Sequence, residues 1–361
     1  MSTASIPFDP KEISEATTIP GFGAGSPTVI FKYPVSPREG YNAVYRRKPL
    51  WQVTGSEQAM FSPKVNPDNI ARAFVFDASG FPMGSGGGPD MFGIEWEYVP
   101  QVGGSMVRPG KPFIEDANEI AEKLVWPDIE KWDWEENAKA NAKFSDGNRS
   151  VVAWFLNGWY ERLISFMDFE GAIMAVFDED QKDAVKDFFS KLSDLYIKIF
   201  DKYLQHFPFI DGFCIHDDWG SQKETFFSPA VANEMIVPYM RRVTDYLHSR
   251  GKYCDLHSCG QAYKQIPNFI AGGWDSWSGQ NMNDTHKIYE DYGDKILIGV
   301  TPEIFDPTTL TEDEQRARAR EYAEKFCRAD KPSIFNYYGA SVQTRAYSEE
   351  LYKQSRMNYS K

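Results

Sequence analysis

Short apolar runs alternate with long amphipathic segments along most of this chain, and this alternation limits the folds open to it more than any other feature. Apolar runs typical of buried strands lie at 50–53, 73–76, 151–156, 210–215, 252–257, 296–300 and 333–337. Strands separated by long helices pair in parallel through right-handed crossovers. In a chain of 361 residues, repeated units of this kind predict a single (β/α)8 TIM barrel rather than an open sheet.

Helices with recognisable ends support this prediction. Apolar residues follow helical spacing over 180–207. A second helix is expected to begin at Ser228, an N-cap followed by proline, and to end at Gly251. Residues 1–44 are rich in Pro, Gly, Ser and Thr, so we expect an N-terminal arm there and the barrel domain over 45–361.

The charge balance is strongly acidic, because 39 Lys and Arg residues stand against 52 Asp and Glu residues, a formal net charge of −13. Such a chain is a poor candidate for binding nucleic acid or an anionic membrane surface. The sequence contains no apolar stretch long enough to cross a bilayer and no visible secretory signal. Its 4 cysteines are too few for a disulfide framework. We therefore expect a cytoplasmic protein with no membrane partner.

Polar side chains gather where two of the expected strands end, which is where a (β/α)8 barrel carries its functional groups. After the strand 252–257, His257 and Cys259 are two residues apart and therefore point to the same side. An imidazole beside a thiolate suits zinc, whose catalytic sites use three protein ligands and leave one position open. The alternative is a buried thiol beside a hydrogen-bonded core histidine.

The strand 210–215 is followed by His216, Asp217 and Asp218. Carboxylates in this position can act as metal ligands or as general acids and bases. The alternative for a single aspartate is a helix N-cap or a loop position. Because carboxylates and a histidine are costly to bury without partners, we predict a functional role for at least one of the three.

These segments resemble the methyltransferase branch of the uroporphyrinogen decarboxylase superfamily. The resemblance rests on DDWGSQ at 217–222, FFSP at 226–229 and LHSCG at 256–260, with a long helix before the last. Further matches are Pro-Leu-Trp at 49–51 and the segments 90–100, 126–134 and 169–179, so that the likeness spans roughly 45–361. It implies a single barrel with the active site at the carboxyl ends of the strands.

The decarboxylase itself is disfavoured on its own motifs. That enzyme binds a polycarboxylate through arginines just after its Pro-x-Trp segment, and residues 52–56 contain no arginine. Phe166 stands where the decarboxylase has a tyrosine, and its Gly-His-Gly stretch is replaced around 335–339. A tetrapyrrole with acidic side chains would also meet a chain of net charge −13.

The methyltransferase branch implies zinc held by His257, Cys259 and a third ligand, with transfer of a methyl group between a small substrate and the cobalt of a corrinoid (cobalamin) protein. Members that methylate thiols take a cysteine as third ligand near the last strand, where this chain has Tyr337 and Tyr338. Methylation of a thiol is therefore disfavoured. The third ligand is left open between Glu303 and one of the carboxylates at 217–218.

The functional hypothesis is zinc-assisted O-demethylation of a methoxylated substrate, an aryl methyl ether. Zinc would stabilise charge on the ether oxygen, with Asp217 or Asp218 as acid and His216 in the same catalytic group. Aromatic side chains are expected to form the substrate pocket: Trp51, Phe166, Trp219, Tyr337 and Tyr338. The alternatives are a metal-free lyase acting on a smaller carboxylic acid and a non-enzymatic binding barrel. A homodimer and a gating loop at 80–93 are further expectations.

Overall fold

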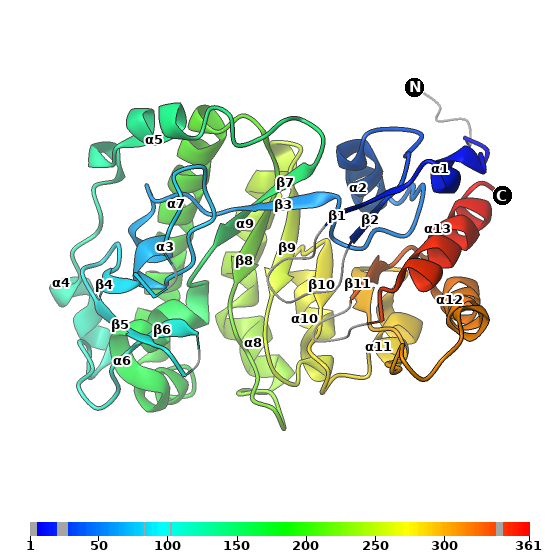
Figure 1. Ribbon diagram of the computed structural model, residues 1–361. Helices are drawn as coiled ribbons and strands as arrows, with labels where there is room; N and C mark the ends of the chain where they lie inside the picture. Colours follow the sequence, from blue (N-terminus) through cyan, green and yellow to red (C-terminus); the bar gives the residue numbers. More distant parts are fainter. Residues whose placement is uncertain (1–5, 20–27, 83, 102, 337–341) are drawn as a thin grey trace. The chain divides into compact units, whose positions relative to one another are not determined.

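The computed structural model describes residues 6–19, 28–82, 84–101, 103–336 and 342–361. These belong to two compact units. Figure 1 labels the helices and strands along the chain. Unit 1 consists of Met1–Ala59, Gly147–Ser150 and Ser276–Lys361, and unit 2 of Met60–Asp146 and Val151–Asp275. The expected division into an arm at 1–44 and a barrel at 45–361 stays a prediction.

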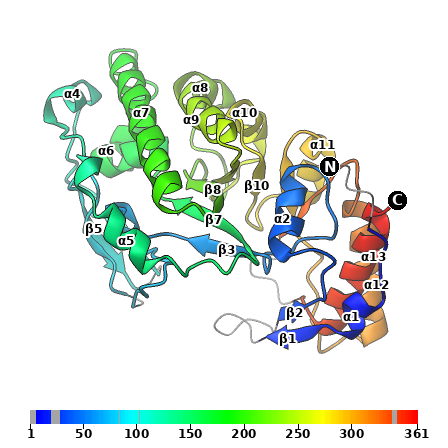
Figure 2. The same cartoon turned by 90° about the horizontal axis from the view of Figure 1, so that it is seen from above.

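Unit 2 is built on three parallel strands, β7 (Ser150–Phe155), β8 (Ile210–His216) and β9 (Tyr253–His257). Their side chains are almost all buried, so each strand is a continuous apolar run. Figure 2 shows helices covering one face of these strands. The helices between and after the strands are α6 (Trp159–Ala175), α7 (Lys182–His206), α8 (Pro229–Met235), α9 (Val237–Ser249), η3 (Tyr263–Gln265) and α10 (Ile266–Ala271).

The core of unit 2 is rich in aromatic side chains where α7 packs on the strands. Phe200 of α7 contacts Phe155 of β7 and Phe213 of β8, with ring centroids 4.8 Å apart in both pairs. The helical spacing of 180–207 is confirmed by α7, whose apolar face is buried. This packing fixes the strands whose carboxyl ends carry the polar residues.

A smaller antiparallel sheet and short helices complete unit 2. The sheet has the order β4-β5-β6, and β4 lies inside the glycine-rich segment 80–93. The elements before β7 are α3 (Pro67–Ala71), β4 (Gly87–Pro89), β5 (Glu95–Val99), β6 (Gly104–Val107), η1 (Ala117–Glu119), α4 (Ile120–Lys123), η2 (Ile129–Lys131) and α5 (Trp134–Ala140).

Unit 1 combines an antiparallel strand pair, β1 and β2, with the parallel strands β10, β11 and β12. The longest helices of this unit, α12 and α13, pack against each other. Its elements are α1 (Lys11–Ser14), β1 (Thr17–Ile19), β2 (Thr28–Ile30), α2 (Pro37–Tyr45), β10 (Ser276–Ser278), α11 (Thr285–Tyr292), β11 (Leu297–Val300), α12 (Glu312–Phe326), β12 (Ile334–Phe335) and α13 (Arg345–Tyr359). The strand β3 (Gln58–Phe61) lies at the boundary between the two units in sequence.

The predicted fold class, an α/β chain of the TIM-barrel type, is confirmed, although individual strands differ. Residues 50–53 are not a strand, and 73–76 contributes only an isolated antiparallel bridge between Phe76 and Ser62. The strand Ser276–Ser278 was not predicted, because Ser-Trp-Ser is not an apolar run. Among the helices within the described ranges, none is long and apolar enough to cross a membrane.

Candidate metal centre

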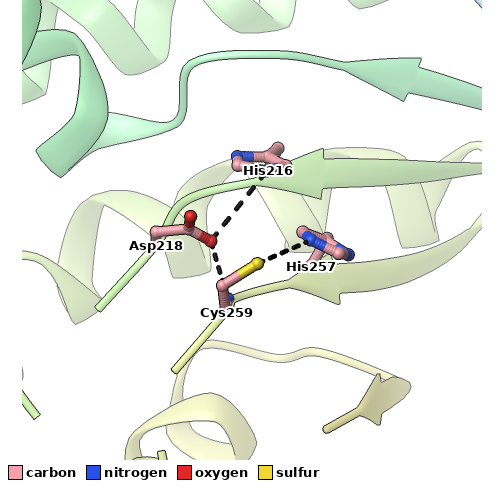
Figure 3. Close-up of side chains that lie close together, drawn as sticks. All are labelled: His216, Asp218, His257 and Cys259. Carbon is pink, nitrogen blue, oxygen red and sulfur yellow. Dashed lines mark hydrogen bonds and ion pairs between the residues drawn. The ribbon is translucent and has the colours of Figure 1, made fainter. Parts of the chain in front are cut away.

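Two histidines lie side by side at the carboxyl ends of β8 and β9. The strands are parallel neighbours, and their register pairs His216 directly with His257. The imidazole rings stack with centroids 4.6 Å apart and an interplanar angle of 22°. Figure 3 shows both rings at the ends of their strands. The sequence predicted functional residues at each of these strand ends. The register of the two strands brings these residues together.

Asp218 and Cys259 follow two residues after each histidine and complete a cluster of four. Each of the four residues offers one ligand atom, and all four atoms lie within 4.8 Å of one another (Figure 3). The His257 Nε2 atom is 3.3 Å from Cys259 Sγ, and His216 Nε2 is 3.9 Å from Asp218 Oδ1. We call His216, Asp218, His257 and Cys259 the four-residue cluster.

Glycines allow the segments after β8 and β9 to approach closely. Gly260 has a φ angle of +82°, and a Cβ atom there would lie 2.1 Å from the carbonyl oxygen of Gly220. The amide of Gln261 donates a hydrogen bond of 2.7 Å to the carbonyl of Ser221. The amide of Cys259 also donates to Asp218 Oδ1 at 2.6 Å, which ties the two segments together at the cluster itself.

The donor atoms of the four-residue cluster fit zinc. Zinc in proteins takes imidazole nitrogen at about 2.0 Å and thiolate sulfur at about 2.3 Å in a tetrahedral arrangement. Ligand atoms around such an ion lie roughly 3.3 to 3.6 Å apart. The separations of 3.3 Å and 3.9 Å within the cluster are close to this range. Nitrogen, sulfur and one carboxylate oxygen are also a donor set that suits zinc better than magnesium or calcium.

A second layer of charged groups lies behind His216. Its Nδ1 atom is 2.5 Å from Oε2 of Glu161, which lies in the first turn of α6. The other oxygen of Glu161 is 3.5 Å from Nη1 of Arg72, and the same Nη1 donates to Asn157 Oδ1 at 2.6 Å. The side chains of Arg72, Glu161 and His216 are 17%, 12% and 13% exposed, so these contacts are largely shielded from water.

Burial and neighbouring charges shift the pKa values in and around the cluster. Burial, reinforced by nearby His216, lowers the pKa of His257 to about 3, so that its imidazole is neutral at neutral pH. Burial opposes ionisation of Glu161, but His216 and Arg72 outweigh it and lower its pKa to about 2. Burial raises the pKa of the Cys259 thiol, and the carboxyl of Asp218 raises it further. A bound cation would favour the thiolate form of Cys259.

Asp217 points elsewhere, although it is adjacent to two members of the cluster. This buried carboxylate accepts hydrogen bonds from the amide of Glu161 at 2.9 Å, the amide of Tyr160 at 3.3 Å and the indole of Trp219 at 2.9 Å. Burial and the charge of Glu161 raise the pKa of Asp217 to about 7. These contacts give Asp217 the role of a cap at the start of α6, one of the alternatives that the sequence left open.

The described members of the expected aromatic pocket are buried in packing contacts. Trp219 of unit 2 is fully buried against Phe227 and Phe269. Phe166, also of unit 2, is fully buried within a group of phenylalanines. Trp51, in unit 1, is buried and donates through its indole to Glu57 at 2.9 Å. Tyr337 and Tyr338 lie outside the described residues.

Glu303, a candidate third ligand, is not part of the four-residue cluster. It belongs to unit 1, where its exposed carboxylate forms an ion pair with Arg318. The place beside His257 and Cys259 is taken by His216 and Asp218 instead. The sequence had suggested His216 as a catalytic residue, and one of the adjacent aspartates as a ligand or an acid.

Sequence reasoning missed Glu161 and Arg72. Glu161 carried a usable signal, since it follows the strand 150–155 after a short turn and therefore also lies at the carboxyl end of a parallel strand. Arg72 carried none, because it follows the short helix α3 and reaches Glu161 only through the tertiary fold.

No family model matches the sequence, and no curated protein matches it either. Among solved structures, a methyltransferase from Methanosarcina mazei matches over 89% of this chain and 98% of its own, with a TM-score of 0.55 and 14% sequence identity. This chain shares its fold with a methyltransferase. At such low identity the likeness concerns the fold alone.

Two other solved structures are more distant. A Group II chitinase catalytic domain from Ostrinia furnacalis matches over 72% of this chain and 67% of its own, with 9% identity and a TM-score of 0.29. A psychrophilic endo-beta-1,4-xylanase of glycoside hydrolase family 10 matches over 61% of this chain and 82% of its own, with 11% identity and a TM-score of 0.34. At TM-scores this low, neither structure bears on the function of this chain.

Proposed function

We propose that this protein is a zinc-dependent methyltransferase that removes the methyl group of a methoxylated substrate, an aryl methyl ether, and passes it to the cobalt of a corrinoid protein. The observation that carries the proposal is the four-residue cluster at the ends of β8 and β9. The fold shared with a methyltransferase supports it, as does the resemblance of the surrounding motifs to the corrinoid-dependent branch.

Three members of the cluster would hold the metal, namely His216, His257 and Cys259. Catalytic zinc sites use three protein ligands and keep one position for the substrate. Asp218 is the better candidate for chemistry on the substrate, because its side chain is 29% exposed whereas that of His216 is 13% exposed. His216 thereby takes the place of the third ligand, for which the sequence had offered Glu303 or one of the carboxylates of Asp217 and Asp218.

Cleavage of an aryl methyl ether needs negative charge stabilised on the departing oxygen. A bound zinc ion would supply a Lewis acid for that charge. Asp218 would give its proton to the ether oxygen as the methyl carbon–oxygen bond breaks, which releases a phenol. The electron pair of the new methyl bond comes from reduced cobalt of the partner, so atoms and electrons balance without a further reactant.

The neutral state of His257 and the contact between His216 and Glu161 suit this role. Metal-bound imidazoles are neutral, and the second ring nitrogen is usually held by a carboxylate or carbonyl. Asp217 has no part in the reaction under this proposal, because its carboxylate is committed to the start of α6.

Metal content tests the proposal directly. We expect about one zinc per chain, measured by elemental mass spectrometry on protein purified without chelator or nickel, and almost none in the double variant His257→Ala/Cys259→Ala. His206→Ala is a matched control, since this histidine of unit 2 stacks on Trp134 and belongs to no group of potential metal ligands among the described residues. Absence of metal from the parent protein, or full activity after chelation, would overturn the proposal and favour a metal-free lyase.

The substrate class has its own test. Zinc-loaded protein is mixed with a cob(I)alamin acceptor and either guaiacol-type ethers or methanol, and formation of the methylated cobalamin is followed by absorbance. We expect turnover of the aryl ethers only. Equal rates with methanol would contradict the aryl methyl ether as the preferred methyl donor.

A further inference from the structure

A largely buried series of interacting side chains lies behind His216, and the proposed reaction does not use it directly. It runs from the four-residue cluster through His216 to Glu161 and then to Arg72, with contacts of 2.5 Å and 3.5 Å between their side chains. Only the His216 end of this chain belongs to the four-residue cluster. Glu161 and Arg72 can therefore reach the metal centre only through the imidazole of His216.

The contact at Nδ1 decides which nitrogen of His216 is available to a metal. An ionised carboxylate can only accept hydrogen bonds, so the proton between Glu161 and His216 resides on Nδ1. A neutral imidazole protonated at Nδ1 carries its lone pair on Nε2. Nε2 is also the atom that lies toward the cluster, 3.9 Å from Asp218 Oδ1. The hydrogen bond to Glu161 and the direction of the ring therefore both leave Nε2 as the atom available to a metal.

Arg72 keeps the carboxylate of Glu161 ionised and in position to accept the hydrogen bond from His216. Its guanidinium lies 3.5 Å from Glu161 and donates to Asn157 at 2.6 Å. The guanidinium also packs against the ring of Trp96, with its central carbon 4.9 Å from the ring centroid. Asn157 is in turn held by its amide, which donates to Asp68 at 3.2 Å. Arg72 is thus fixed from several sides, and its charge remains directed at the carboxylate.

We propose that Glu161, held by Arg72, is a positioning residue that keeps His216 in the Nδ1–H tautomer with Nε2 directed into the four-residue cluster. This inference rests on the proposed function, because only a metal bound in the cluster requires the lone pair of His216 on Nε2. The tautomer itself does not depend on whether metal binds. Carboxylate partners of this kind typically contribute 10- to 100-fold to metal affinity.

The first measurement is the tautomer of His216 in metal-free protein. The chain has 5 histidines, so selective ¹⁵N-histidine labelling gives a simple two-bond ¹H–¹⁵N spectrum, in which His216→Gln identifies the signals of His216. Burial lowers the pKa of His216 but Glu161 outweighs it and raises this pKa, so the spectrum is recorded at a pH where the imidazole is neutral. We expect the Nδ1–H tautomer in the parent protein and a mixture of tautomers in Glu161→Gln, whose amide can either donate or accept. An Nε2–H tautomer in the parent protein would overturn the proposal.

The second measurement is the affinity for Co²⁺, followed by its visible absorption bands. We expect Glu161→Gln to bind Co²⁺ 10- to 100-fold more weakly than the parent protein. Glu170→Gln is the matched control, an exposed glutamate on the same helix, and should bind like the parent. Equal affinity in Glu161→Gln and the parent would overturn the proposal. A parent that shows the Nδ1–H tautomer but binds no Co²⁺ supports the positioning role and overturns the metal-dependent function instead.

Discussion

Adjacent aspartates at the end of β8 have different surroundings, so the same substitution should have opposite effects. Asp217→Ala leaves buried amides of α6 and the Trp219 indole without an acceptor, so we expect the free energy of unfolding to fall by about 2 to 3 kcal/mol. The zinc content should be unchanged. Asp218→Ala removes one hydrogen bond to Cys259 and should abolish methyl transfer with little loss of stability.

Urea unfolding and metal analysis of the two variants check this prediction. Each variant serves as the control of the other, because they differ by one position in the chain. Loss of methyl transfer in a stable Asp217→Ala protein, with normal activity in Asp218→Ala, would reverse the roles assigned here.

The residues of the site were partly predictable from the sequence. His257 and Cys259 followed from their spacing at a strand end, because alternation along a strand is a local property. The sequence could not tell which of Asp217 and Asp218 faces the cluster, because the two adjacent carboxylates differ only in their hydrogen bonds. Glu303 was suggested because it follows a strand, a rule that selects an end of the sheet but no individual position.

At the scale of elements, a buried ion pair ties α1 to the last helix of the chain. Both helices belong to unit 1, and they lie side by side in Figures 1 and 2. Glu12 Oε2 accepts hydrogen bonds from Arg356 Nε at 2.8 Å and from the Tyr352 hydroxyl at 2.6 Å. The side chains of Glu12 and Arg356 are 6% and 1% exposed. Removing one charge leaves the other buried without its partner, which is costly.

We expect Glu12→Gln to lower the free energy of unfolding at pH 7 by about 3 kcal/mol. Burial opposes ionisation of Glu12, but the bonds from Arg356 and Tyr352 outweigh it and lower the pKa below its ordinary 4.5. The pair therefore contributes its full stability above pH 4.5 and loses it as the pH falls through the lowered value. The difference between parent and variant should shrink accordingly in acid.

Denaturant unfolding at several pH values measures this difference. Glu15→Gln is the control from the same segment, because Glu15 and its partner Lys32 are 46% and 58% exposed. An exposed pair of this kind contributes about 0 to 1 kcal/mol. A constant difference between Glu12→Gln and the parent from neutral to acidic pH would contradict the assignment.

The strands also show what local sequence can and cannot give. The runs at 151–156, 210–215 and 252–257 match β7, β8 and β9 closely, because strands buried on both faces are continuous apolar segments. Ser276–Ser278 is too short and polar for that signal. The register of His216 with His257 was out of reach as well, since it depends on how far α8, α9 and their loops shift one strand along the other.

At the scale of the whole molecule, metal binding should appear as added stability. A ligand that binds only the folded chain stabilises it by about 2.7 kcal/mol at 100 times its Kd. The three proposed ligands come from the ends of two strands, β8 and β9, that are far apart in sequence, so the unfolded chain cannot reproduce the site. Zinc should therefore raise the midpoint of thermal unfolding, and a chelator should reverse the rise.

Hydrogen exchange locates this stabilisation within the chain. We expect zinc to slow exchange most strongly in peptides that contain β8 and β9, because opening either strand separates the ligands. The His257→Ala/Cys259→Ala variant should show neither the thermal shift nor the slowed exchange, whereas His206→Ala should show both. If zinc slowed hydrogen exchange equally in the double variant and the parent, zinc would bind elsewhere on this acidic chain. The four-residue cluster would then not be the metal centre.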